Sequence, residues 1–123
     1  MGGVILVIDD DPDQRRLIER VLTASGYRVL TAIDGQAGVA AAESHRPDLI
    51  VLDVMMPRLN GYQTCRALRQ SSRTASTPIL ILTTKQEPAD EFWATQVGAN
   101  EFLTKPVDVP GLLAAVARYA GTP

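Results

Sequence analysis

The sequence has very few of the residues that cross-link small folds through disulfides or bind transition metals. Among 123 residues there is one cysteine, Cys65, and one histidine, His45. A single cysteine forms no disulfide within the chain, so the fold depends on a hydrophobic core, as is usual in a reducing cytoplasm. A zinc site, which needs cysteine or histidine ligands, is disfavoured for the same reason. We interpret Cys65 as a half-buried packing residue and His45 as a surface residue near a helix end.

The chain also lacks a cluster of basic residues and a long apolar run. Its 12 Lys and Arg are outnumbered by 14 Asp and Glu, and they form no patch of the kind that binds nucleic acid. No segment approaches the ~20 apolar residues that span a bilayer, and the first residues lack the basic leader of a signal peptide. With 46% hydrophobic residues and neither a repeat nor a linker, residues 1–123 are predicted to form a single cytoplasmic domain that binds neither nucleic acid nor membrane directly.

Five short apolar segments alternate with segments of helical character. The apolar segments consist of β-branched residues and leucine without polar alternation, which is typical of parallel strands buried on both faces. The expected strands are Val4–Ile8, Val29–Ile33, Leu49–Leu52, Ile79–Leu82 and Phe102–Leu103. The expected helices are 12–25, Gly38–Glu43, Tyr62–Gln70, Ala89–Val97 and Leu112–Tyr119. This alternation predicts a doubly wound α/β fold with right-handed crossovers.

The first helix has the clearest boundaries and the clearest apolar face. Asp11 is placed to cap it, Pro12 suits its first turn, and Gln14 occupies the capping-box position from which a side chain reaches back to the cap. Gly26 is expected to end the helix in a left-handed conformation. The predicted apolar stripe is Leu17, Ile18, Val21 and Leu22. In later helices, Ala67, Leu68, Leu112, Leu113 and Val116 are expected to face the core.

Polar residues follow four of the predicted strands directly. They are Asp9, Asp10, Asp53, Thr83, Thr84 and Lys105. The carboxyl ends of parallel strands meet at one edge of the sheet, where this architecture binds its ligands. Two carboxylates ~4 Å apart repel by ~4 kcal/mol at an effective dielectric near 20, so the cluster favours a divalent cation, and Mg²⁺ suits oxygen ligands. An aspartate beside Mg²⁺ and a lysine can attack phosphorus in line, and Asp53 is the best candidate nucleophile.

Four segments together resemble the signature segments of the response-regulator receiver family of two-component signalling, which includes chemotaxis regulators. They are VILVIDDD, LIVLDVMMPRLNG, PILILTT and GANEFLTKP, and the resemblance covers nearly the whole chain. It implies a flavodoxin-like (βα)5 three-layer sandwich with the strand order 2-1-3-4-5.

The resemblance also implies roles for particular residues. Asp53 would be the phosphoacceptor, and Mg²⁺ would be held by Asp9, Asp10, Asp53 and the backbone carbonyl of Met55. Thr83, Thr84 and Phe102 would be switch residues, and Lys105 would contact the phosphoryl group. The bond from Lys105 to Pro106 would be the family's cis peptide. Phe102 departs from the more frequent tyrosine, and Thr84 stands where a smaller residue is commoner.

A receiver is a signalling switch and not an enzyme acting on an outside substrate. The resemblance therefore implies a histidine kinase or phosphotransfer protein as phosphoryl donor, and a downstream target protein or output domain as receiver of the signal. The oligomeric state would be a monomer or a phosphorylation-dependent homodimer, and Phe92 or Trp93 would lie on the fourth-helix surface.

Three other interpretations fit parts of the sequence. The acids Asp9, Asp11 and Asp13 have the opening spacing of a calcium loop, but Gln14 and Arg20 replace its required Gly and Glu. A strand followed by Asp-x-Asp also resembles haloacid-dehalogenase-type phosphatases, although the chain has no room for a cap domain. A docking-only pseudo-receiver is the third. The complete set of acids and lysine favours the phosphoacceptor interpretation over these three.

Overall fold

Five parallel strands form one sheet in the order β2-β1-β3-β4-β5. The structure is a computed structural model, and it describes residues 3–53, 61–83 and 98–122. The strands are β1 (Val4–Ile8), β2 (Arg28–Ala32), β3 (Leu49–Asp53), β4 (Ile79–Thr83) and β5 (Glu101–Thr104). The parallel sheet and its predicted order are confirmed.

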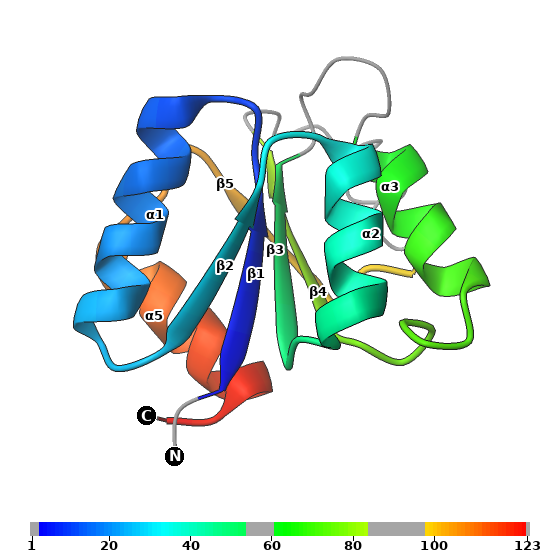
Figure 1. Cartoon of the computed structure of the whole chain (residues 1–123). Helices are drawn as coiled ribbons and strands as arrows, with labels where there is room; N and C mark the ends of the chain where they lie inside the picture. Colours follow the sequence, from blue (N-terminus) through cyan, green and yellow to red (C-terminus); the bar gives the residue numbers. More distant parts are fainter. Residues whose placement is uncertain (1–2, 54–60, 84–97, 123) are drawn as a thin grey trace.

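Helices cover both faces of this sheet. Helices α1 (Pro12–Ala24) and α5 (Val109–Ala120) lie on one side, and α2 (Gly35–His45) and α3 (Gly61–Gln70) lie on the other (Figure 1). The three-layer, flavodoxin-like α/β fold is therefore confirmed. The predicted helix Ala89–Val97 lies outside the described residues. Among the helices that the structure describes, none combines the length and the apolar character needed to cross a bilayer.

Strands β1, β3 and β4 are buried on both faces, and their alternate residues point to opposite helical layers. The predicted burial of both faces is wrong for β2 and β5, which lie at the sheet edges and are partly exposed. Leu6 and Ile8 of β1 belong to a core cluster with Cys65 and Leu68 of α3, whereas Ile5 and Val7 belong to a cluster with residues of α1 and α5. This double burial explains why the strand sequences show no polar alternation.

Helix α1 begins and ends as predicted. The Asp11 side chain accepts hydrogen bonds from the backbone N–H groups of Asp13 and Gln14, and Pro12 is the first helical residue. Gly26 has φ +101°, the left-handed conformation that glycine adopts without steric cost. Two buried residues of the predicted stripe, Ile18 and Leu22, are one turn apart and face the sheet.

Leu17 was wrongly predicted to face the core. Its exposed fraction is 59%. Neighbouring residues on a helix differ by about 100° in direction, so a helix that directs Ile18 at the sheet turns Leu17 toward its flank.

The predicted core contact of Leu113 is confirmed, since this partly buried side chain packs against the cluster that contains Leu112 and Val116. Ala67 is only partly buried, and Cys65, which was predicted to be half-buried, is fully buried.

Several element boundaries differ from the predicted ones. Strand β2 begins at Arg28 and ends at Ala32, which leaves Ile33 60% exposed beyond the strand. Helix α2 extends beyond the predicted Gly38–Glu43 in both directions. Its cap is Asp34, whose side chain accepts a hydrogen bond from the backbone N–H of Ala37 at 2.8 Å. The first residue of the helix is Gly35, and glycine disfavours helix, so the sequence did not indicate that the helix begins here.

Gly38 lets helix α2 approach the end of β1 closely. A Cβ atom at this position would lie 2.4 Å from Cδ1 and 2.8 Å from Cγ1 of Ile8. Ile8 is fully buried and immediately precedes Asp9, so its side chain has little freedom to move aside. The glycine thus serves the packing that fixes the sheet edge.

We expect Gly38→Ala to lower the free energy of unfolding by about 1–3 kcal/mol, because overpacking outweighs the gain in helix propensity. Urea unfolding measures this change. At the exposed position 40 of the same helix, Ala40→Gly should lower the free energy of unfolding by about 1 kcal/mol, because glycine has a lower helix propensity than alanine. Adding Ile8→Val to Gly38→Ala should give a smaller loss than the sum of the two single losses. A stabilising Gly38→Ala would contradict the close contact.

Candidate functional site

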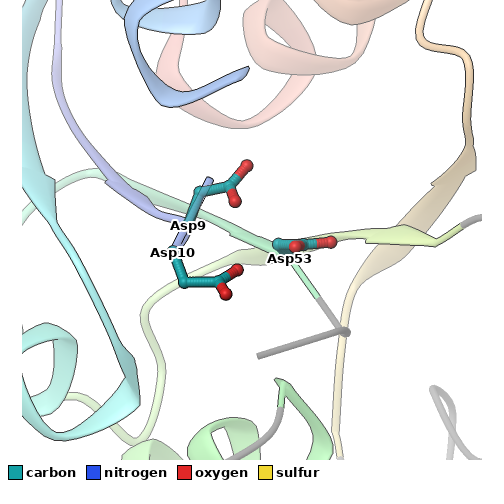
Figure 2. A group of neighbouring side chains, drawn as sticks. All are labelled: Asp9, Asp10 and Asp53. Atoms are coloured by element: carbon teal, nitrogen blue, oxygen red, sulfur yellow. The ribbon is translucent and has the colours of Figure 1, made fainter. Parts of the chain in front are cut away.

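The strand register brings the predicted acids together at one edge of the sheet. Ile8 of β1 pairs with Leu52 of β3, so Asp9 and Asp53 follow on adjacent strands. One carboxylate oxygen from each of Asp9, Asp10 and Asp53 lies within 4.8 Å of the other two. Figure 2 shows the first two side chains at the end of β1 and the third at the end of β3. The acidic cluster predicted from the sequence is therefore present in the structure.

Asp9 is the most constrained member of this cluster. It is 1% exposed. Its Oδ1 accepts a hydrogen bond from the backbone N–H of Asp11 at 2.9 Å, and its Oδ2 accepts one from the Gln14 side-chain amide. Burial raises the pKa of the Asp9 carboxyl from 3.8 to about 6, the hydrogen bonds from Asp11 and Gln14 limit the rise, and the charge of Asp53 adds to it.

Asp53 is paired with the predicted lysine. Lys105 Nζ lies 2.6 Å from Oδ1 of Asp53, and the carboxylate of Asp53 is almost fully buried. The backbone N–H of Lys105 donates to the carbonyl oxygen of Thr83 at 2.6 Å, which ties the lysine to the end of β4. The peptide bond from Lys105 to Pro106 is cis, the isomer that the family resemblance implies.

The remaining predicted residues are distributed as follows. Thr83 is the last residue of β4 and is 2% exposed, at the same sheet edge as Asp53. Phe102 of β5 is half-buried and packs against the core cluster on the α2 and α3 side. Met55 and Thr84 lie outside the described residues, as do Phe92 and Trp93.

Gln14 has a different role from the one predicted. A capping-box side chain would reach back to the N–H of Asp11, but that N–H donates to Asp9 and the Gln14 amide also donates to Asp9. Arg15 adds a third link, because its Nη1 donates to the carbonyl oxygen of Asp9 at 2.9 Å. Sequence spacing places both side chains in the first turn of α1, but only the packed fold shows that Asp9 is their acceptor.

The donor set of the cluster fits Mg²⁺. All three groups are carboxylates, the oxygen ligands that Mg²⁺ takes in proteins, and two of them are buried beside each other with like charge. Cys65, in contrast, is buried within α3, and burial raises the pKa of its thiol to about 11, so it remains a protonated packing residue at neutral pH.

The chain is thus a doubly wound α/β domain with an acidic cluster and a lysine at the carboxyl edge of its five-stranded sheet. A family model described as the response regulator receiver domain matches residues 5–117. The chain belongs to this family of signalling proteins.

Individual relatives agree with this assignment. The chain is 39% identical over 112 residues to protein PilH of Pseudomonas aeruginosa, covering 91% of this chain and 93% of that protein. Its structure resembles chemotaxis protein CheY4 of Vibrio cholerae, with a TM-score of 0.92, 35% identity and coverage of 97% and 99% of the two chains. It also resembles the receiver domain of sensor histidine kinase PA1611 of P. aeruginosa, with a TM-score of 0.90, 34% identity and coverage of 99% and 100%.

Two facts about these relatives bear on function. The PA1611 receiver structure has a magnesium ion coordinated in its active site cleft. Several other curated relatives, which include transcriptional regulators, are longer proteins, and the chain spans 43–50% of their length.

We predict that Asp9→Asn stabilises the metal-free protein at pH 8 by about 1–3 kcal/mol, because ionising a buried carboxyl with a raised pKa costs folding free energy. The native protein binds the Asp9 proton more tightly than the unfolded chain does. The stability that this tighter proton binding gives the wild type is therefore present below about pH 4 and is lost as pH rises through about 6.

Urea unfolding in a chelator at pH 4 to 8 tests this prediction. The free-energy difference between Asp9→Asn and the wild type should grow across the interval from pH 4 to 6. A difference that is independent of pH, or a less stable variant at pH 8, would contradict the raised pKa.

Proposed function

We propose that this chain is a phosphoacceptor that takes a phosphoryl group onto Asp53 in the presence of Mg²⁺ and thereby changes its affinity for a partner. The observation that supports this most directly is the pairing of buried Asp53 with Lys105 beside the carboxylates of Asp9 and Asp10. A carboxylate held by a cation at the carboxyl edge of a parallel sheet is positioned as a nucleophile for phosphorus.

The proposed chemistry is a simple transfer. An oxygen of Asp53 forms a bond to phosphorus while the bond from phosphorus to a histidine nitrogen of the donor protein breaks, and the donor histidine keeps the electron pair. Lys105 offsets negative charge on the transferred group, and the hydroxyl of Thr83 would bind one of its oxygens. Asp9, Asp10, Asp53 and the backbone carbonyl of Met55 would hold Mg²⁺, which neutralises phosphoryl charge when bound.

The proposed output is a change in binding. A histidine kinase or phosphotransfer protein would be the donor, and Thr83, Thr84 and Phe102 would transmit the phosphorylated state to a target protein or an output domain. Changing the population from mostly inactive to mostly active requires about 5 kcal/mol of differential stabilisation. Under this proposal the chain acts on itself and is not an enzyme for an outside substrate. The cytoplasmic location and the monomer or phosphorylation-dependent homodimer remain predictions.

We expect incubation with acetyl phosphate and Mg²⁺ to add one phosphoryl group per chain, measured as intact mass. Asp53→Asn should abolish the adduct because the nucleophilic oxygen is lost, and a chelator should abolish it in the wild type. Asp13→Asn is the matched control, since Asp13 is an exposed acid in the first turn of α1, and it should leave the adduct unchanged.

The alternatives give different results in the same experiment. A docking-only domain would show no adduct under any condition. A phosphatase would release phosphate repeatedly from the donor. An adduct that persists in Asp53→Asn would show that another residue is the acceptor.

A further inference from the structure

Gln14 links helix α1 to a buried carboxylate of the acidic cluster. It is the third residue of the helix, and its side-chain amide donates to Oδ2 of Asp9. The backbone N–H of Asp11 donates to the other oxygen of the same carboxylate at 2.9 Å. Both oxygens of Asp9 are therefore bound by donors from the N-terminal cap and first turn of α1.

These hydrogen bonds hold Asp9 on the side of the sheet where α1 lies. Asp9 continues the alternation of Ile5 and Val7, which pack against α1 and α5. In Figure 2 the carboxylate of Asp9 is directed toward the helices of this layer, whereas that of Asp10 extends beside Asp53. One oxygen of each acid lies within 4.8 Å of the other two, and Mg²⁺ binds its oxygen ligands at about 2.1 Å. A shared cation would therefore draw the Asp9 carboxylate closer to the other two, away from the Gln14 amide.

A cavity beside Gln14 gives its side chain room to move. This cavity has a volume of about 300 Å³ and is lined mainly by apolar side chains of α1 and of the segment that leads into α5. Gln14 is part of its wall, together with Leu17 and Val109, whose exposed fractions are 59% and 43%. The amide can thus leave Asp9 without displacing a packed core residue.

We infer that Gln14 controls the affinity of the acidic cluster for Mg²⁺: its amide holds Asp9 in the metal-free protein and releases it when the cation binds. Asp9 is almost fully buried, so water does not easily replace the lost donor. Lys105 holds Asp53 in the same state, so each of the two buried carboxylates has an internal partner before the cation arrives. The inference rests on the proposed function, since it concerns the proposed Mg²⁺ site.

The test replaces the amide by a side chain of similar length that has no donor. Gln14→Met should lower the dissociation constant for Mg²⁺ by about ten- to a hundredfold, because the metal-free state alone loses a hydrogen bond to a charged group. Titration calorimetry with MgCl₂ measures the constant. Gln36→Met is the matched control, since Gln36 is an exposed residue in the first turn of α2, and it should leave the constant unchanged.

A second measurement separates control of Mg²⁺ binding from a merely structural role. If Gln14 competes with the cation, Gln14→Met lowers the unfolding midpoint of the metal-free protein and enlarges the rise that saturating Mg²⁺ produces. Equal lowering with and without Mg²⁺ would instead assign Gln14 to fold stability and overturn the inference.

The outcomes also distinguish this inference from the proposed function. Wild-type protein that binds Mg²⁺, with Gln14→Met binding it equally or more weakly, overturns the inference alone. Wild-type protein that shows no binding at millimolar Mg²⁺, or binding unaffected by Asp53→Asn, overturns the proposed site and the inference with it.

Discussion

Asp9 and Asp53 are buried beside each other at the carboxyl edge of the sheet, where their charges repel. The pairing of Lys105 with Asp53 at 2.6 Å supplies about 6 kcal/mol of attraction at an effective dielectric of 20, before desolvation is counted. Removing each ion from water costs several kcal/mol, so the pair orients the carboxylate more than it stabilises the fold. Burial raises the pKa of the Asp9 carboxyl, and its hydrogen bonds from Asp11 and Gln14 offset only part of this rise.

The rest of the fold holds these charges in place. Strands β1, β3 and β4 are fully buried over most of their length, and their side chains pack between two helical layers. This packing fixes the backbone from which Asp9 and Asp53 project, and the close approach of α2 at Gly38 adds to it on one face. The packed backbone keeps the two carboxylates close together, so their repulsion is offset by bound donors or by a cation.

Sequence patterns predict the sheet and the cluster because both depend on simple geometry. Unbroken apolar segments indicate buried parallel strands, and an acid that directly follows such a strand must lie at the sheet edge. They do not predict the partner of Gln14. From the first turn of a helix its amide can reach the cap or the end of β1, and only the packing of α1 decides between them. Leu17 was wrongly predicted because the apolar stripe is wider than the surface that the sheet covers.

The neutral character of Gln14 matters for a site that has to attract a cation. A lysine at this position would neutralise Asp9 and oppose a second positive charge nearby. The amide stabilises the carboxylate by a hydrogen bond and leaves its charge intact. At neutral pH, three carboxylates and one ammonium leave the cluster with a net charge of −2, which a divalent cation offsets. A donor without charge therefore holds the buried acid in the metal-free protein and preserves the electrostatic attraction for Mg²⁺.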